Sequence, residues 1–231
     1  MTEVNNIPRH IGYIVDGNRR WAKKHGLPSY EGHLAGYNTV QDIVTATFEA
    51  GVKYISLYIF STENWKRSED EVSRIMGMLI KSLTSDLPIF EKNNIKLVIL
   101  GSREGLSDRI IKEIDNAEAV TAKNTSGTLA VCFNYGGQLE IVDAVKKIIQ
   151  SGASADEITP ELIGENIYLP EIPPIDLVVR TSGEQRLSNF MLWRVAYSEI
   201  MFIDKLWPDL TKDDVTDILT EFNRRSRRFG G

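Results

Sequence analysis

The sequence predicts an α/β protein, a single domain with a central, mostly parallel sheet of about six strands flanked by helices. Three observations support this fold class: short apolar runs recur along the chain, they lack a polar-apolar alternation, and stretches with helical periodicity separate them. Strands buried on both faces have such runs, and strands that alternate with helices form parallel sheets. The predicted strands are residues 11–15, 54–60, 97–100, 129–133, 177–179 and 201–203.

Helix signals fill the intervals between these strands and place helices on both faces of the sheet. Apolar residues recur at helical spacing in two long stretches, 40–51 and 72–83. Ser107, Thr159 and Thr211 each precede residues that favour a first helical turn, so we expect a helix to begin after each of them. The apolar side of 72–83 is expected to belong to the core.

Length and composition are those of an ordinary globular protein. The chain has 231 residues, of which 42% are hydrophobic and 26% charged, and no long linker divides it, so we expect one domain over residues 1–231. Lys and Arg total 27 against 32 Asp and Glu, a net charge of −5, so the whole protein has no cationic field that would hold nucleic acid or an anionic membrane. We expect no nucleic-acid partner and at most peripheral membrane contact.

Cysteine usage and the N-terminal residues indicate the compartment. Cys132 is the only cysteine, which excludes disulfides within the chain and cysteine-based zinc sites and fits a reducing environment. The sequence lacks a signal-peptide pattern and any window near the ~18 apolar residues that a membrane span requires. We expect a soluble, cytoplasmic protein.

Polar residues gather where three predicted strands end. The first strand leads into residues 16–21, the second into 61–67 and the fifth into 180–189, and all three segments contain arginine. Ligands of open parallel sheets bind beyond the carboxyl ends of the strands, so these segments should form one rim. Arginine forks, hydroxyl groups and the free N–H groups of a helix beginning near Gly17 suit an anionic ligand with phosphate groups.

Asp16 among these arginines indicates a divalent cation. A carboxylate repels phosphate, whereas Mg²⁺ bridges the two, so a diphosphate accompanied by Mg²⁺ explains the combination. The common nucleotide-binding loops GxxxxGK[ST] and GxGxxG are absent, as are the hydrolase patterns HExxH and GxSxG. Residues 213–217 spell DDxxD, a magnesium-binding pattern of all-helical synthases, but they follow Thr211 directly and are interpreted as the start of the last helix.

Several segments together resemble the cis-prenyltransferase family, and within it the bacterial undecaprenyl diphosphate synthases. They are HIGYIVDGNRRWAKK from His10, Gly32-His33, FSTENWKR at 60–67, NYGG at 134–137, DLVVRTSGEQRLSNFMLW at 176–193, LWPD at 206–209 and RRFGG at 227–231. Each segment alone is a weak signal, but together they span the chain from His10 to its C-terminus. The resemblance implies a prenyltransferase that adds isopentenyl diphosphate to an allylic diphosphate, farnesyl diphosphate being the expected primer, with Mg²⁺ as cofactor. The implied product is a polyprenyl diphosphate, such as the undecaprenyl precursor of the cell-wall lipid carrier.

The same resemblance implies roles for individual residues. Asp16 is expected to be catalytic, through Mg²⁺ and the leaving diphosphate, and Asn64 to assist removal of a proton. Substrate-binding positions around them are Gly17, Asn18, Arg19, Arg20, Trp21, His33, Ser61, Thr62, Glu63, Trp65 and Arg67. The positions expected to bind isopentenyl diphosphate are Arg180, Arg186, Leu187 and Ser188, and Glu199 is a second metal contact. Glu71 matches a further acidic position, and a homodimer is implied in which the C-terminal segment completes the partner's site.

Plainer interpretations of these residues stay open. His33 could be an ordinary surface histidine, and Trp21 and Trp65 could simply pack. Glu63 could pair with a neighbouring arginine, and Glu199 could be a surface acid. An amide is a poor base, so a diphosphate oxygen could replace Asn64 as proton acceptor.

Two departures from the family pattern bear on function. Ser29 stands where many members carry arginine, which removes a cation that Arg19 could partly replace. Ile59 stands where long-chain members often carry alanine, so elongation could stop early and give shorter products. Two alternatives to the long-chain synthase follow: a short-chain or irregular prenyl diphosphate synthase, and a non-catalytic partner subunit, which the intact Asp16 disfavours.

Overall fold

A six-stranded sheet forms the centre of the protein, in a computed structural model that describes residues 6–225. The strands are β1 (His10–Ile14), β2 (Tyr54–Ser61), β3 (Ile95–Leu100), β4 (Gly127–Tyr135), β5 (Leu177–Arg180) and β6 (Glu199–Phe202). Their order is β3-β4-β2-β1-β5-β6, and every neighbouring pair is parallel. The expected fold class is confirmed, and the sheet is entirely rather than mostly parallel.

Seven α-helices lie between the strands and an eighth follows β6. They are α1 (Asn18–Lys24), α2 (Ser29–Glu49), α3 (Glu69–Thr84), α4 (Leu87–Lys92), α5 (Asp108–Thr121), α6 (Gly137–Gln150), α7 (Pro160–Asn166) and α8 (Lys212–Arg224) within residues 6–225. Three short 3₁₀ helices accompany them: η1 (Thr62–Lys66), η2 (Ala155–Glu157) and η3 (Trp207–Asp209). The predicted helix starts are confirmed, because Ser107 and Thr159 accept hydrogen bonds from the first turns of α5 and α7, and Thr211 forms a capping box at α8.

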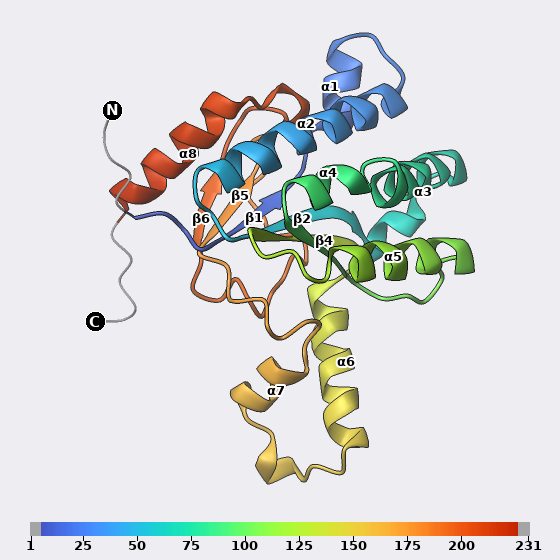
Figure 1. Cartoon of the computed structure of the whole chain (residues 1–231), viewed down its shortest axis with the longest axis vertical. Coiled ribbons are helices and arrows are strands. Elements are labelled where there is room, and N and C mark those ends of the chain that lie inside the picture. Colours follow the sequence, from blue (N-terminus) through green and yellow to red (C-terminus); the bar gives the residue numbers. More distant parts are fainter. Residues whose placement is uncertain (1–5, 226–231) are drawn as a thin grey trace.

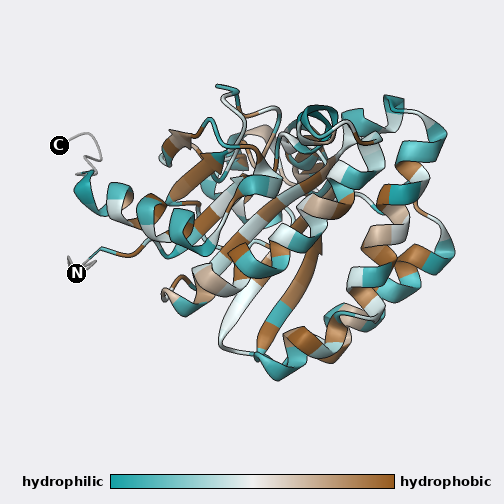
Figure 2. Cartoon of the chain, turned by 90° about the horizontal axis from the view of Figure 1, so that it is seen from above, coloured by the Kyte–Doolittle hydropathy of each residue, from teal (hydrophilic) through white to brown (hydrophobic). Residues whose placement is uncertain are grey.

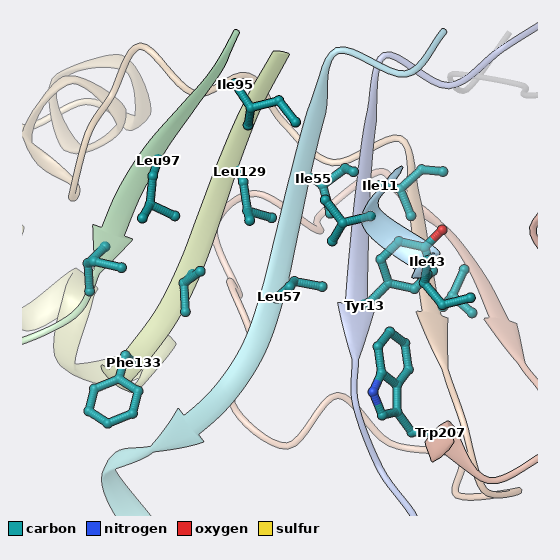
Figure 3. Packing of buried hydrophobic residues seen from close by; sticks show 14 of the residues in the cluster. Ile11, Tyr13, Ile43, Ile55, Leu57, Ile95, Leu97, Leu129, Phe133 and Trp207 are labelled. Atoms are coloured by element: carbon teal, nitrogen blue, oxygen red, sulfur yellow. The ribbon is translucent and has the colours of Figure 1, made fainter. Parts of the chain in front are cut away.

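Alternate residues of the strands face two different apolar layers, which explains the unbroken apolar runs. Leu129, Val131 and Phe133 of β4 pack in the larger cluster, while Ala130 and Cys132 between them pack in the smaller one. Figure 3 shows part of the larger cluster, with side chains from neighbouring strands side by side. In Figure 2 hydrophobic residues run along the strands, whereas the helices around them alternate between hydrophobic and hydrophilic residues.

Helices cover the two faces unevenly. Buried residues of α2, α3, α5 and α8 complete the larger cluster, whereas residues 172–195, which lie largely outside helices, supply much of the smaller one. Helices α6 and α7 project away from the sheet (Figure 1). A buried ion pair, Arg194 Nη1 to Glu140 Oε1 at 2.9 Å, joins the first turns of α6 to this segment, and the Tyr135 hydroxyl donates to the same carboxylate at 2.6 Å.

The strand order places a switch point beside β1. The chain leaves β1 towards β2 on one side and later returns to pair β5 with β1 on the other. Loops diverge at such a point, and a crevice opens past the carboxyl ends of the strands. The segments after β1, β2 and β5 therefore converge at this edge, as the sequence predicts.

Two irregularities in the pairing of β2 with β4 alter which residues face the larger cluster. Tyr58 pairs with Cys132 and Phe60 with Phe133, so Ile59 is skipped; Ser61 then pairs with Tyr135, which skips Asn134. A bulge of this kind turns consecutive side chains to one face. Ile59 and Phe60 accordingly both pack towards the larger cluster.

None of the helices in residues 6–225 combines the length and the apolar character that a bilayer span requires.

Candidate active site

A cavity of about 730 Å³ opens at the carboxyl ends of β1 and β2, beneath α2 and α3. Its polar lining consists of Asp16, Gly17, Asn18, Arg19, Arg20, Lys23, Ser29, His33, Arg67, Ser82, Glu184 and Arg186. Its apolar lining consists of Val15, Leu27, Val40, Leu57, Ile59, Ile75, Met78, Leu79, Phe90, Leu129, Val131 and Trp207, with Gly36 and Tyr37 beside them. The cavity therefore has a charged part at the strand ends and a hydrocarbon-like part along the sheet.

Asp16 lies two residues beyond β1, opposite the end of β5. Its Oδ2 accepts a hydrogen bond from Arg180 Nη2 at 2.8 Å, and its Oδ1 accepts one from the Gly17 N–H at 2.7 Å. The Thr181 hydroxyl fixes the Asp16 backbone, accepting from its N–H at 2.9 Å and donating to its carbonyl at 2.6 Å. The Trp207 N–H donates to the same carbonyl at 3.0 Å. The carboxylate is thus held in place from three segments and still has a third of its side-chain surface exposed.

Arg180 is a buried cation that joins two parts of the site. Its side chain is only 5% exposed, and Nη1 donates to Ser188 Oγ at 2.8 Å and to the Arg186 carbonyl. Its Nε–H has no partner within residues 6–225, although buried polar groups normally have one. The loop after β5 is therefore organised around this guanidinium group.

Arg20 and Arg186 share one carboxylate, that of Glu184. Arg20 Nη2 lies 3.3 Å from Glu184 Oε1, and Arg186 Nη1 bonds to Oε2. Arg20 Nη1 also donates to the Ser182 carbonyl at 2.9 Å. Two cations with half-exposed side chains thus face the cavity from α1 and from the loop after β5.

The start of α1 crosses α2 at two glycines one turn apart. A Cβ at Gly32 would lie 1.9 Å from the Asn18 carbonyl oxygen, and one at Gly36 would lie 2.3 Å from Asn18 Oδ1, so neither position admits a side chain. This close approach explains the Gly32-His33 pair of the sequence. It places His33 at the cavity next to the residues that follow β1.

His33 belongs to a small charged cluster at the cavity edge. Glu71 Oε1 lies 3.0 Å from both His33 Nε2 and Arg67 Nη1, linking α2, α3 and the residue after η1. Burial lowers the pKa of His33 and outweighs the opposing effect of Glu71, so the imidazole is neutral near pH 7. His33 is therefore a partly buried cavity residue rather than an ordinary surface histidine.

The η1 segment presents few of its side chains to the cavity. Asn64 Oδ1 accepts from the Ser61 N–H at 3.2 Å within a capping box, and Trp65 Nε1 donates to Asn134 Oδ1 at 2.7 Å. Thr62 and Trp65 border a separate, smaller hollow of about 330 Å³. Glu63 pairs with the Asn189 amide at 3.1 Å instead of an arginine. Among the residues expected after β2, Arg67 lines the cavity and the others form the frame of η1.

The structure does not bring every predicted site residue to the cavity. Trp21 Nε1 donates to Asp209 Oδ1 at 2.7 Å, and Leu187 packs on the smaller cluster. Glu199 is the first residue of β6, opposite the first residue of β5, so it lies at the other end of the sheet from Asp16 and pairs with Arg225 at 3.3 Å. Asp16 and Glu199 therefore do not share a metal site within one chain. The C-terminal Arg227 and Arg228 lie outside the described residues.

Some cavity residues were missed by the sequence reasoning. Lys23 lies one turn after Arg19 and Arg20, a helical spacing that could have revealed it. Glu184 stands between Arg180 and Arg186, but its charge is negative, whereas a phosphate site is expected to contain cations. Asn189 lies outside the cavity, and the sequence gave no sign of its contacts, because its partners Glu63 and Gln138 come from distant segments.

The residues present fit Mg²⁺ that arrives with a phosphate ligand. Mg²⁺ is usually held by one or two carboxylates together with phosphate oxygens and water. Asp16 offers one partly exposed carboxylate at the charged part of the cavity, whereas residues 6–225 contain no cluster of three or more metal-binding side chains. The site suits a metal ion shared with a ligand rather than one held by the protein alone.

The fold and the cavity define a class of protein, one that handles an amphiphile with an anionic head and a hydrocarbon tail. Comparisons with known proteins give the family. A family profile described as "Putative undecaprenyl diphosphate synthase" matches residues 14–230. The isoprenyl transferase of Thermotoga maritima is 43% identical over 97% of both chains, and that of Neisseria meningitidis serogroup A is 45% identical over 97% of this chain and 90% of its own.

Solved structures agree. The lavandulyl diphosphate synthase of Lavandula x intermedia, in complex with dimethylallyl diphosphate, superposes with a TM-score of 0.91 at 30% identity, covering 99% of this chain and 100% of its own. A probable undecaprenyl diphosphate synthase from Campylobacter jejuni gives 0.83 at 34% identity, covering 98% of this chain and all of its own. The chain therefore belongs to the undecaprenyl diphosphate synthase family of isoprenyl transferases, the cis-prenyltransferases, and is a prenyltransferase.

Proposed function

We propose that this chain is an Mg²⁺-dependent cis-prenyltransferase that condenses isopentenyl diphosphate onto an allylic diphosphate, with farnesyl diphosphate as the primer. The product is a polyprenyl diphosphate such as undecaprenyl diphosphate, the precursor of a cell-wall lipid carrier. The observation that carries this proposal is the cavity itself, whose charged part surrounds Asp16 and whose apolar part continues along the sheet. A diphosphate head and a growing hydrocarbon tail match these two parts.

The allylic diphosphate binds with its head among Arg19, Arg20 and Lys23 and its tail against the apolar lining. The carbon–oxygen bond to this diphosphate breaks, and negative charge collects on the leaving group. Cations already in place stabilise that charge without reorganising. Asp16 would hold Mg²⁺, which neutralises diphosphate oxygens when bound.

Isopentenyl diphosphate binds at the loop after β5, where Arg186 and Ser188 reach it and the buried Arg180 fixes the loop. A carbon–carbon bond forms from its double bond to the allylic carbon, and one proton then leaves. Asn64 Oδ1 already accepts the Ser61 N–H, so the carboxamide is occupied in framing η1. A diphosphate oxygen is the better proton acceptor, and Asn64 is assigned to positioning.

A short-chain or irregular prenyl diphosphate synthase is the second candidate. Two observations favour it: Ile59 lines the cavity, and the fold superposes closely on a lavandulyl diphosphate synthase. A non-catalytic partner subunit is disfavoured, because Asp16 is present and held in place. We further propose that residues 1–231 act as one catalytic domain, and that the protein is a cytoplasmic homodimer with only peripheral membrane contact. In this homodimer Glu199 is a candidate for the second metal contact.

Prenyl transfer by the purified protein tests the proposal. Incubation with labelled isopentenyl diphosphate, farnesyl diphosphate and Mg²⁺ should give labelled prenyl product, and Asp16→Ala should lower kcat by about a thousandfold, because it removes charge stabilisation needed only as the diphosphate leaves. Asp213→Ala is the matched control: Asp213 lies in the first turn of α8 and should leave kcat within about twofold. Near-normal turnover in Asp16→Ala would remove Asp16 from its role, and no product from the wild type would favour the subunit.

A further inference from the structure

Two segments of the proposed site meet away from the cavity, on the side of the NYGG motif. The η1 segment carries Asn64, and the loop after β5 carries Arg186 and Ser188. Both segments lie against the first turn of α6, where Asn189 contacts Gln138 of α6 and Glu63 of η1. The proposed function assigns no role to the residues of this motif, 134–137.

Asn189 uses three polar groups at this junction. Its backbone carbonyl accepts from the Gly137 N–H at 2.8 Å, and its Oδ1 accepts from the Gln138 N–H at 2.8 Å. Its Nδ2 donates to Glu63 Oε1 at 3.1 Å. One side chain thus ties the loop after β5 to α6 and to η1.

The glycines of the motif make room for this contact. A Cβ at Gly136 would lie 2.9 Å from both Asn189 Nδ2 and Thr62 Oγ1, and one at Gly137 would lie 3.0 Å from the Asn189 carbonyl oxygen. Such distances are too short for a side chain without displacing η1 or the loop. The glycines therefore allow the two segments to approach.

The backbone of the loop is held in an uncommon conformation. Ser182, Ser188, Asn189 and Met191 all have positive φ, four of the seven non-glycine residues that do so within residues 6–225. Such residues persist only where surrounding contacts fix them, and they are frequent at functional sites. Ser188, which accepts from Arg180, directly precedes Asn189.

Glu63 is ionised where Asn189 reaches it. Burial would raise the pKa of this carboxyl, but hydrogen bonds from its own backbone, Ser61, Asn189 and Thr62 outweigh burial and leave the pKa lowered. A carboxylate accepts and cannot donate, so the Asn189 amide is the required donor.

From these contacts we propose that Asn189 is a positioning residue. Through its hydrogen bond to Glu63, it aligns the segment that bears Asn64 with the loop that binds isopentenyl diphosphate. The inference rests on the proposed function and assigns a purpose to the NYGG motif. Each segment binds its own part of the substrates without this bond, but the reacting atoms align only when both are fixed. Loss of the bond should therefore lower kcat more than it raises either KM.

A donor-acceptor exchange tests the bond directly. Asn189→Asp keeps an oxygen for the Gln138 N–H but sets a carboxylate against Glu63, and should lower kcat about fivefold, a modest effect because the pair is solvent-exposed. Glu63→Gln keeps an acceptor oxygen for the Asn189 amide and is the second single variant of the cycle; it should lower kcat less than Asn189→Asp does. The variant with both substitutions places an amide at position 63 opposite a carboxylate at position 189, which restores the bond with its direction reversed and should recover most of the lost kcat.

Two further readouts separate positioning from mere stability. The kcat deficit of Asn189→Asp should shrink from about pH 8 to about pH 5, relative to the wild type at the same pH, as one of the facing carboxyls takes up a proton and becomes a donor. Asn116→Asp, at an exposed position of α5, adds the same charge away from the site and should change neither kcat nor its pH profile.

The outcomes are distinct. Rescue in the double variant with unchanged KM values supports the inference. Equal kcat in the wild type and Asn189→Asp, a deficit that the double variant fails to rescue, or a deficit that follows the loss of Tm would overturn it. A wild type that makes no prenyl product defeats the proposed function and this inference with it, whereas an active wild type with an indifferent Asn189→Asp defeats the inference alone.

Discussion

Ser29 opens α2 and faces the charged part of the cavity together with Arg19 and Lys23. The serine side chain is short and leaves space in front of it. An arginine at this position would fill that space and reach the negative charge of a bound diphosphate. Arg19 lines the same part of the cavity, and we expect it to supply part of the charge that an arginine at position 29 would provide. Ser29 is therefore a position at which substrate affinity can be raised without altering the residues around Asp16.

Ser29→Arg should lower the KM for the allylic diphosphate about fivefold, because a guanidinium fork adds charge-assisted hydrogen bonds to the diphosphate. Steady-state kinetics at fixed isopentenyl diphosphate measures this. Ser85→Arg, which adds the same charge on an exposed position after α3, should leave KM unchanged. An unchanged or higher KM in Ser29→Arg would show that the allylic diphosphate lacks no cation at position 29.

The surroundings of Asp16 predict how Mg²⁺ and a diphosphate bind to the protein. Because residues 6–225 contain no cluster of metal-binding side chains, Mg²⁺ alone should bind weakly, and it should bind well only with a diphosphate. Calorimetric titration with inorganic pyrophosphate should show at least about tenfold tighter binding with Mg²⁺ than without it. Asp16→Asn should reduce that gain to about twofold, and tight binding of Mg²⁺ without pyrophosphate would contradict a shared site.

Among the elements, β2 brings Ile59 to the apolar part of the cavity. Ile59 shares a face of the strand with Leu57, two residues before it, and lines the cavity beside Leu57 and Val131. The bulge after Tyr58 turns Phe60 to this face as well, where it is fully buried in the larger cluster. The side chain at position 59 therefore bears on the length of the hydrocarbon that fits.

Ile59→Ala should lengthen the main product by at least about one five-carbon unit, because the side chain removed occupies space that the growing tail needs. Chromatography of the dephosphorylated products measures the change. Ile149→Ala, at an exposed position on α6, is the control and should leave the product pattern unchanged. A dominant undecaprenyl species from the wild type, or the same pattern in Ile59→Ala, would show that Ile59 does not block elongation.

At the scale of the whole molecule, His10 connects the sheet to the segment that covers its second face. It is fully buried, with Nδ1 2.8 Å from the Pro173 carbonyl oxygen and Nε2 2.8 Å from Ser56 Oγ. The neutral ring satisfies both contacts by donating to the carbonyl and accepting from the hydroxyl. Burial lowers the pKa of His10 to about 4 from its ordinary value of 6.5.

The stability of the protein should therefore fall as the pH drops from about 6.5 towards 4. The unfolded chain takes up a proton on His10 in this range and the folded chain does not, so protonation favours unfolding. Between pH 7 and about pH 4.5 the free energy of unfolding should decrease by about 2 kcal/mol more in the wild type than in His10→Gln. Urea unfolding at both pH values measures the difference, and equal pH dependence in the two proteins would mean that His10 titrates normally in the fold.

The strands, the helix starts and the charged rim could all be predicted from the order of the amino acids. Continuous apolar runs mark strands covered on both faces, and capping residues act within a few positions of themselves, so local order suffices for both. The convergence of residues after β1, β2 and β5 followed from the rule for parallel sheets, and Arg20, Arg67 and Arg186 do face one cavity.

The partner of each polar group, by contrast, depends on how the elements pack in three dimensions. Asp16 meets Arg180 across 164 residues and Glu63 meets Asn189 across 126. Glu199, which the resemblance groups with Asp16 as a metal contact, lies instead at the far end of the sheet. Register, bulges and the close approach at Gly32, Gly36 and Gly136 set these pairings. They arise from how distant segments pack, and a hydrogen bond depends on distances of a few tenths of an ångström that no local pattern encodes.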